Sequence, residues 1–172
     1  MSLLNLEPES TAWIDFQDCD PFGHLNNVKY LNYIMNARTQ QLKMAYGFDI
    51  YEHTAKTGNG WVVGTTHISY LAPARYNETV RIQTRLLHAS NFRIVPEAVI
   101  TSTDGSKIHA IAWIEFVYVN IAKGRPLKHE PELLAFLQSL QIPNFEWASE
   151  DFSLRVRELQ KTLRPPREVV AV

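Results

Sequence analysis

The segment Asp18–Asn27, which reads DCDPFGHLNN, concentrates the side chains best suited to chemistry. Asp20 and His24 stand just before a stretch with helical periodicity, so both are expected near the N-terminus of a helix. The unpaired N–H groups and the dipole at such a terminus favour developing negative charge. A carboxylate, an imidazole and an oxyanion-binding amide together suit acyl transfer to water. The segment therefore predicts a hydrolytic site.

Two other interpretations of this segment remain open. Asp, Asn, Pro and Gly are common turn formers, so Asp18 or Asp20 can serve simply to cap backbone amides. Asp18, Asp20 and His24 are also legitimate metal ligands, although no HExxH motif or second histidine cluster completes a shell, which disfavours a metal site. Cys19 lies between two acids that disfavour its thiolate, so we do not expect a nucleophilic cysteine. The sequence also lacks the GxSxG, GxGxxG and Walker motifs of serine hydrolases and nucleotide-binding proteins.

Other ionisable residues favour structural roles. His67 and His109 lie in predicted strands among apolar residues, where a histidine usually belongs to the core or to an interface. Glu115 falls in the last predicted strand, and we expect an ion-paired structural residue there in preference to a second catalytic acid.

One long amphipathic helix is predicted between Asn27 and Gly47. This stretch contains no Pro or internal Gly, and its apolar residues recur at helical spacing. Asn26 or Asn27 supplies a side-chain oxygen for the N-cap, and Gly47 suits a left-handed C-terminal cap. The helix would begin at the candidate site and fill the concave face of a sheet.

Strand signals dominate the middle of the chain. The strand that starts at Thr79 alternates cleanly, so one of its faces is solvated. Pro96 removes one ladder donor, so an edge or a bulge is expected there. The last strand is apolar on both faces, which predicts that another subunit covers its outer face. The predicted strands, joined by short loops that indicate an antiparallel meander, are Thr11–Phe16, Trp61–Leu71, Thr79–His88, Phe92–Thr101 and Lys107–Val119.

The tail holds two shorter helical patterns, Pro131–Leu140 and Glu150–Leu163, before the Pro-rich run Arg164–Arg167 ends regular structure. We expect residues 1–140 to form a single domain. Residues 141–172 are expected to form a C-terminal extension with one helix, which is not a separate domain.

Length and composition bound the class of protein. A chain of 172 residues with 45% hydrophobic residues can bury one sizeable core. Its 17 Lys and Arg against 18 Asp and Glu leave a formal charge of -1, which gives no reason to expect nucleic acid as a partner. The single cysteine, the absence of a basic and apolar leader, and the absence of an apolar run of about 20 residues predict a cytoplasmic protein with no membrane partner.

The stretch FQDCDPFGHLNNVKYLNYIMNAR resembles the signature of the 4-hydroxybenzoyl-CoA thioesterase branch of the hotdog-fold superfamily, with its D-x-D-x-x-G-H-x-N-N-x-x-Y pattern at the start of a long helix. ISYLAPARYNETV and GRP resemble later segments of that family, so the likeness covers roughly Ala12 to Glu130. The resemblance implies an α+β hotdog fold, in which a curved antiparallel sheet of about five strands wraps one long helix. It also implies hydrolysis of acyl thioesters, most often acyl-CoA, by paired subunits.

The same resemblance implies roles for individual residues. Asp20 takes the position of the catalytic aspartate, as nucleophile or as base for water, and the backbone amide of Asn27 takes that of the oxyanion donor. His24 joins them as a catalytic position. The implied substrate-binding positions are Gly23, Asn26, Tyr30 and Arg75.

Departures from related enzymes narrow the assignment. The run HLNNVKY is also similar to plant acyl-carrier-protein thioesterases, but Phe22 replaces one Asn of their pattern and residues 71–75, LAPAR, lack their Glu. Other hotdog thioesterases place an acid on the long helix, whereas the stretch from Asn27 to Gly47 contains no Asp or Glu and has Asn36 where an acid is common. Asp20 must therefore carry any thioester hydrolysis.

These expectations converge on an acyl-CoA thioesterase that needs no metal or organic cofactor and acts as a homodimer or homotetramer. The alternative is a non-catalytic module that binds acyl thioesters or a partner and has kept the fold. A hotdog dehydratase is disfavoured, because its usual acid on the helix is missing.

Overall fold

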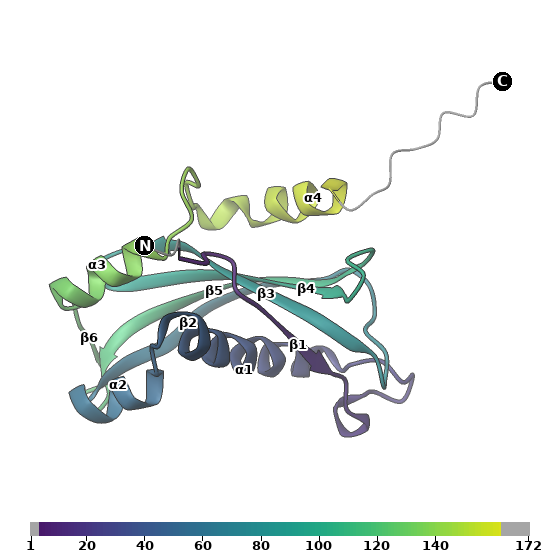
Figure 1. Ribbon diagram of the computed structural model, residues 1–172, viewed down its shortest axis with the longest axis horizontal. Helices are drawn as coiled ribbons and strands as arrows, with labels where there is room; N and C mark the ends of the chain where they lie inside the picture. The colour runs from purple at the N-terminus through teal and green to yellow at the C-terminus, as the bar shows by residue number, and fades with distance from the viewer. Residues whose placement is uncertain (1–3, 163–172) are drawn as a thin grey trace.

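The computed structural model describes residues 4–162. A long helix lies across the concave face of one curved sheet, and shorter helices lie at one end of the sheet and on its outer face (Figure 1). The elements in chain order are β1 (Glu9–Trp13), the short 3-10 helix η1 (Phe16–Asp18), α1 (Asn27–Tyr46), α2 (Ile50–Thr57), β2 (Asn59–Tyr70), β3 (Thr79–Ala89), β4 (Arg93–Ser102), β5 (Ile108–Asn120), β6 (Arg125–Pro126), α3 (Pro131–Ser139), η2 (Ser149–Asp151) and α4 (Phe152–Thr162).

The sheet has the strand order β1-β3-β4-β5-β2, with β6 paired to β5, and every pair is antiparallel. The inward residues of α1, among them Tyr30 and Ile34, are almost fully buried in one core with sheet residues such as Ile100 and Ala112. Burying a large apolar side chain contributes about 1.5–3 kcal/mol, so this contact holds α1 against the sheet. The predicted α+β arrangement, a curved antiparallel sheet around one long helix, is confirmed.

Both ends of α1 are fixed by the predicted local signals. The Asn26 side chain accepts the backbone N–H of Val28, which makes Asn26 the N-cap. At the other end Gly47 adopts φ 68°, a left-handed conformation that a residue with a Cβ rarely adopts. The helix therefore starts directly after the candidate site loop.

The predicted meander is wrong for one strand. β3, β4 and β5 follow one another, but β2 pairs with β5 at the far edge of the sheet, from Asn59 opposite Asn120 to Tyr70 opposite Ala110. The connection of residues 71–78 is long enough in extended form to cross the width of the intervening strands. This crossover carries the β2–β3 loop past the N-terminus of α1.

Pro96 lies in β4, which is an interior strand, so the expectation of an edge is wrong and that of a bulge is confirmed. Pro96 pairs with Leu86, and the register shifts between Leu86 and His88 on β3. Proline has no N–H to donate, and the extra residue in β3 lets the ladder continue past that missing bond.

The outer face of β5 is covered by this same chain, not by another subunit as predicted. Phe152 and Val156 of α4 pack with Ile111 and Trp113 in a second apolar cluster, on the convex side of the sheet. An apolar helix face and an apolar sheet face bury each other, and the sequence contains both. Leu163 and the run Arg164–Arg167, which belong to the predicted tail, lie outside the described residues.

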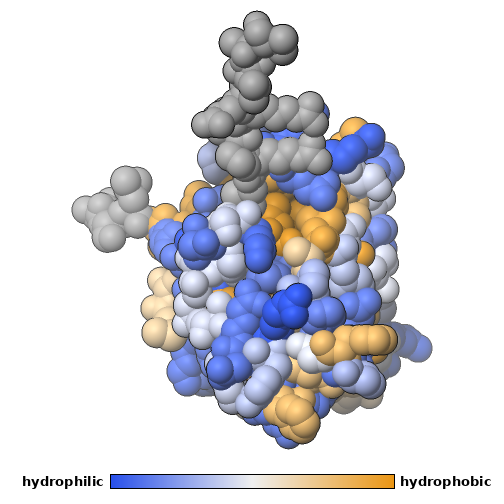
Figure 2. Space-filling view, turned by 90° about the vertical axis from the view of Figure 1, so that its right-hand side faces the viewer, coloured by the Kyte–Doolittle hydropathy of each residue, from blue (hydrophilic) through white to orange (hydrophobic). Residues whose placement is uncertain are grey.

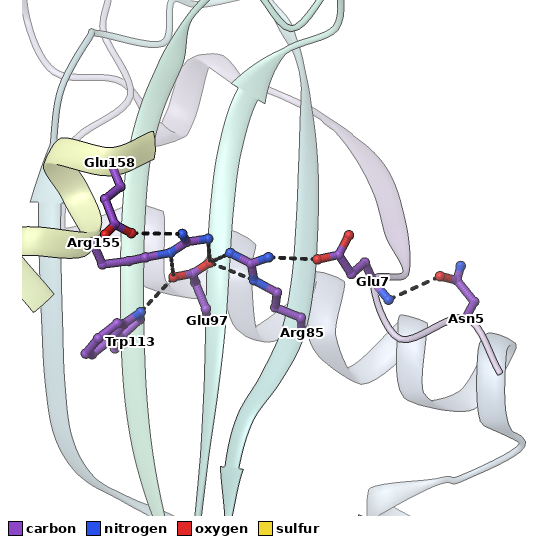
Figure 3. A network of polar contacts seen from close by, with 7 residues as sticks. All are labelled: Asn5, Glu7, Arg85, Glu97, Trp113, Arg155 and Glu158. Atoms are coloured by element: carbon purple, nitrogen blue, oxygen red, sulfur yellow. Dashed lines mark hydrogen bonds and ion pairs between the residues drawn. The ribbon is translucent and has the colours of Figure 1, made fainter. Parts of the chain in front are cut away.

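A polar network ties α4 to the sheet beside this cluster (Figure 3). Glu97 of β4 is fully buried and accepts Nε1–H of Trp113 at 2.8 Å and Nε–H of Arg155 at 3.0 Å. Arg85 of β3 also donates to the Glu97 carboxylate. Burial alone would lower the pKa of Arg85, but the charges of Glu97 and Glu7 raise it above its ordinary value. The buried acid is thus fully paired, and α4 is held in one position.

Helix α2 and strand β6 were missed by the sequence analysis. Asp49 caps α2 by accepting the N–H groups of Tyr51 and Glu52, and Gly58 ends it at φ 69°. An Asp N-cap and a Gly C-cap are both visible in the sequence, and together they indicate a short helix between residues 49 and 58. Among the helices of residues 4–162, none combines the length and the apolar character needed to cross a membrane.

Candidate active site

The site is built where two loops meet at the N-terminus of α1. Leu25 donates its backbone N–H to the carbonyl of Ala74 at 2.8 Å, and Tyr76 donates to the carbonyl of Gly23 at 2.9 Å. His24 and Arg75 form an isolated antiparallel bridge between them. The loop that follows η1 is therefore fastened to the β2–β3 loop.

Asp20 holds its own loop closed. One oxygen, Oδ1, accepts the backbone N–H of Phe22 at 2.9 Å and that of His24 at 3.1 Å. The turn passes through Gly23 at φ 74°, where glycine is favoured. Among the hydrogen bonds between described residues, none uses the second oxygen, Oδ2. The capping interpretation and the catalytic interpretation of Asp20 are thus compatible, because each uses a different oxygen.

A cavity of about 230 Å³ lies between the loops and α1. It brings together four residues that were predicted as site residues, Asp20, His24, Asn27 and Tyr30. Gly23, Asn26 and Arg75 do not line it: Gly23 makes the turn, Asn26 caps α1, and Arg75 is exposed beside the loop. The other lining residues are Leu25, Tyr70, Leu71, Ala72 and Pro73.

Asn27, the first residue of α1, lines this cavity. Asn26 satisfies the N–H of Val28, while the N–H of Asn27 has no partner among the described hydrogen bonds. Tyr70 donates its hydroxyl to the carbonyl of Asn27 at 2.9 Å and so holds the helix end in place. An N–H at a helix N-terminus can stabilise an oxyanion.

Two tyrosines line the cavity, Tyr30 from the buried side and Tyr70 from the exposed side. The Tyr30 hydroxyl accepts the backbone N–H of Ala74 at 3.2 Å, and its ring packs edge-on against Tyr70 with centroids 5.2 Å apart. Burial raises the pKa of Tyr30, so the hydroxyl stays protonated at neutral pH. Tyr30 therefore serves the site as a neutral wall that also supports the β2–β3 loop.

Asp18 is separate from Asp20 in its contacts. It accepts hydrogen bonds from Lys29 Nζ and from the Tyr33 hydroxyl, each at 2.9 Å, and the Lys29 contact lowers the pKa of its carboxyl.

Within residues 4–162, no three His, Cys, Asp or Glu side chains gather closely enough to hold a metal ion, so Asp18, Asp20 and His24 do not form the alternative metal site. Burial, and then the nearby acids, raise the pKa of the Cys19 thiol, which disfavours a thiolate nucleophile.

The remaining singled-out residues lie outside the cavity. Glu115 pairs with Arg93 at 3.0 Å, in the structural role that was expected. His109 is buried and its Nδ1 lies 3.2 Å from the carbonyl of Ala72, while His67 packs against Phe152 of α4. His109 therefore supports the loop behind the cavity without lining it.

Tyr70, Leu71, Ala72 and Pro73 were not predicted as site residues. Nothing in their local spacing indicates that β2 ends beside α1, because this placement depends on the long crossover to β3. Apolar side chains also stand on the exposed surface of the site loop and its flanks: Phe16 is 72% exposed, Phe22 82% and Val28 73%. Figure 2 faces the end of the molecule that carries these loops and shows apolar areas among hydrophilic ones.

Sequence comparisons identify the family of this chain and a relative. A family model described as the Thioesterase-like superfamily matches residues 14–137. Long-chain acyl-CoA thioesterase FadM of Escherichia coli (strain K12) is 26% identical over 121 residues, which cover 70% of this chain and 89% of FadM.

Solved structures share the fold at lower identity. YbaW, a probable thioesterase from Escherichia coli, superposes with a TM-score of 0.66 at 24% identity and covers 78% of this chain and 98% of its own. The 12:0-ACP thioesterase from Umbellularia californica gives a TM-score of 0.74 at 16% identity, over 87% of this chain and 56% of that protein. These likenesses identify the hotdog fold that the sequence predicted.

Proposed function

The chain belongs to the Thioesterase-like superfamily, and from this premise we propose that it hydrolyses acyl-CoA thioesters to a free acid and CoA. The similarity to FadM, named a long-chain acyl-CoA thioesterase, supports CoA as the thiol. The narrower assignment to the 4-hydroxybenzoyl-CoA branch stays a prediction from the sequence signature.

One observation carries the proposal. Asp20, His24 and Asn27, whose N–H is the first amide of α1, line a single cavity, with one Asp20 oxygen engaged in the loop and the other without a partner among the described hydrogen bonds. Hydrolysis of a thioester needs a carboxylate near the carbonyl carbon and a donor near the carbonyl oxygen. These two groups are what this cavity offers.

The chemistry follows from that placement. In the general-base route, Asp20 takes a proton from water as the hydroxide attacks the carbonyl carbon, and the N–H of Asn27 stabilises the oxyanion. The C–S bond then breaks, and the departing thiolate takes the proton back from Asp20. In the nucleophilic route Asp20 attacks the carbonyl carbon, the C–S bond breaks and the thiolate departs, which leaves a mixed anhydride. Water then hydrolyses the anhydride to the free acid and regenerates the Asp20 carboxylate, and a proton from this water goes to the thiolate. Both routes leave a free acid and a thiol.

The surrounding residues are assigned supporting roles. His24 orients the thioester or its loop, and Tyr30 shapes the inner wall. Gly23 makes the turn of the loop and Asn26 caps the start of α1, and the substrate lies against both of these segments. Arg75 is exposed next to the bridge with His24, and a guanidinium there suits the phosphates of CoA.

We also propose that two copies pair through β2. This edge strand reads NGWVVGTTHISY and has no Lys, Arg or Pro to discourage pairing, although it contains one bulge next to Gly64. Val62 and Val63 are 43% and 45% exposed on it. A second β2 would satisfy the free edge and cover these side chains. Tyr70, at the end of β2, would then bring the site close to the subunit boundary.

The test is release of free thiol from a panel of acyl-CoAs, measured with a thiol-reactive chromophore, alongside matched acyl-carrier-protein thioesters. Turnover of acyl-CoA supports the proposal. Saturable binding of acyl-CoA without release would support the rival function, a non-catalytic binding module, and turnover of the carrier-protein thioesters alone would change the substrate class.

A further inference from the structure

Arg38 is a buried cation on α1 that the proposed chemistry does not use. Its side chain is 7% exposed. Within the part of the chain that the structure describes, it makes one hydrogen bond, from Nη1 to Thr84 Oγ1 at 3.3 Å, and no ion pair with a carboxylate. A guanidinium has five N–H donors, so most of them remain for another acceptor.

The polar neighbours of Arg38 satisfy one another without it. Thr84 donates its hydroxyl to Gln41 Oε1 at 2.5 Å. Gln41 in turn donates from Nε2 to the Ser10 hydroxyl at 3.0 Å and to the Ile82 carbonyl at 2.9 Å. This network needs no positive charge. Because burying an unpaired charge is costly, a cation kept here calls for an anionic partner.

Arg38 lines an apolar cavity of about 150 Å³. The cavity lies between α1, the sheet, α2 and α3, and aromatic side chains such as Phe48, Trp61 and Phe136 form much of its wall. It opens beside Tyr51, which is 74% exposed. Burial lowers the pKa of Arg38 to about 10, which leaves the guanidinium charged at neutral pH. A dry cavity of this size holds a molecule as large as benzene.

This cavity lies along α1 from the candidate active site. Arg38 follows Asn27 by eleven residues, which is about 16 Å of helix. Leu31 and Met35 stand between them at helical spacing and pack on the core. At the near end Tyr30 packs on Tyr70 of β2, and at the far end Met35 and Trp61 of β2 line the Arg38 cavity. Figure 1 shows α2 and α3 at the end of the sheet opposite the site loop.

The concave face of β2 carries apolar side chains between Trp61 and Tyr70, and it is partly exposed to solvent. Ile68 and Val63 of β2 pair with Ala112 and Phe116 of β5, both of which belong to the core under α1, so they share that concave face. Val63 is 45% exposed there. The residues of α1 and of the concave face of β2 that lie between the candidate active site and the buried cation are therefore mostly apolar.

We propose that the Arg38 cavity receives the far end of the acyl group and that Arg38 pairs with a carboxylate there, so that the preferred substrates are acyl-CoAs of medium length with a terminal carboxylate. This assignment rests on the proposed thioesterase function. An acyl chain that ends in a methyl group would contact the apolar lining of the cavity but leave the N–H donors of Arg38 unpaired. A terminal carboxylate would accept hydrogen bonds from two of these donors side by side.

The test compares dodecanedioyl-CoA with lauroyl-CoA, which differ only at the far end of the chain. The kcat/KM ratio of the two substrates is measured for the wild type, Arg38→Met, Arg38→Lys and the control Lys43→Met, which removes an exposed cation from the same helix. The wild type is expected to prefer dodecanedioyl-CoA, and Arg38→Met to lower the ratio at least about tenfold, because a hydrogen bond to a charged group contributes on that scale. Arg38→Lys should keep part of the preference, and Lys43→Met all of it.

The experiment distinguishes an error in the proposed substrate, an acyl-CoA with a terminal carboxylate, from an error in the proposed thioesterase activity. Hydrolysis of lauroyl-CoA with no preference for the dicarboxylic substrate, or a ratio that Arg38→Met leaves unchanged, overturns the assignment and leaves the thioesterase proposal standing. If neither thioester is hydrolysed, calorimetric titration with the same two thioesters, dodecanedioyl-CoA and lauroyl-CoA, decides. Tighter binding of dodecanedioyl-CoA that Arg38→Met abolishes supports the carboxylate site, and equal binding of both thioesters overturns it.

Discussion

The Asp20 carboxylate accepts the backbone N–H of His24 at 3.1 Å, while the backbone N–H of Asp20 donates to the carbonyl of His24 at 2.7 Å. The two residues therefore close their loop from both sides. An Asn side chain retains an oxygen that can accept the same N–H, whereas Ala removes it. Asp20→Asn thus tests the charge with the loop kept, and Asp20→Ala would change both at once.

His24→Ala is expected to lower turnover by less than about 10²-fold, the lower limit for losing a general acid or base. The reason is that His24 lines the cavity with its side chain but is held by its backbone. Steady-state kcat on an accepted acyl-CoA measures the loss, with His67→Ala, outside the cavity, as the control. A loss as large as that of Asp20→Asn would instead make the imidazole a partner in proton transfer.

Arg155→Ala is expected to destabilise the protein by about 1.5–3 kcal/mol, the scale of a hydrogen bond to a buried charged group, because Glu97 would keep only Arg85 and Trp113. Urea unfolding measures the change. Arg157→Ala on the exposed side of α4 is the matched control and should change the free energy of unfolding little. Equal losses of stability in the two variants would contradict the conclusion that Arg155 ties α4 to the sheet through Glu97.

The stability of the fold should decrease as the pH falls from 7 to 5. His129 donates from Nδ1 to the Ser90 carbonyl at 2.9 Å and accepts Nε1–H of Trp61 at 3.0 Å, so its ring must be neutral. Burial lowers its pKa below the unfolded value of about 6.5, so the unfolded chain binds more protons as the pH falls through that value.

Urea unfolding at several pH values measures this dependence. His53 and His88, whose pKa values are also lowered by burial, act in the same direction. His129→Gln keeps an acceptor and a donor but does not titrate, so it should reduce the slope of stability against pH without removing it. An unchanged slope in this variant would contradict the assignment to His129.

Val62→Lys is expected to dissociate the proposed dimer, because a lysine on an edge strand disfavours pairing with a second edge. Light scattering at micromolar concentration should give two or four chains for the wild type and half that number for the variant. Leu154→Lys, which changes a similarly exposed residue on α4, should leave the mass unchanged. A wild-type monomer with full activity would refute pairing as a requirement for the site.

Local signals made part of this molecule predictable. Asn26 and Gly47 fix the ends of α1 through their own backbone and side-chain chemistry, and the turn residues around Asp20 fold their own loop. The clean alternation after Thr79 predicted β3 because one face of that strand is buried and the other is polar, although this polar face is half-buried and not solvated as predicted. The four predicted residues that line the cavity, Asp20, His24, Asn27 and Tyr30, also belong to this short stretch of chain, although the cavity itself needs the β2–β3 loop as well.

Long-range placement was not predictable in the same way. The position of β2 beside β5 depends on a crossover, and this crossover is what brings Tyr70 to the site. The cover on Trp113 comes from α4, far along the chain, so the apolar outer face of β5 was assigned to another subunit. Arg38 was not singled out from the sequence, because its lack of a carboxylate partner among the described residues exists only in three dimensions.

The role of Asp20 in the chemistry is tested by the turnover of an accepted acyl-CoA by Asp20→Asn and Asp18→Asn, together with the thermal unfolding of both variants. Asp20→Asn should lower kcat by at least about 10²-fold with a nearly unchanged Tm, since it removes the base or nucleophile and keeps the loop. Asp18→Asn should lower kcat much less, because Asp18 pairs with Lys29 and Tyr33 outside the cavity. Wild-type turnover by a folded Asp20→Asn variant would contradict the assignment of Asp20 to the chemistry.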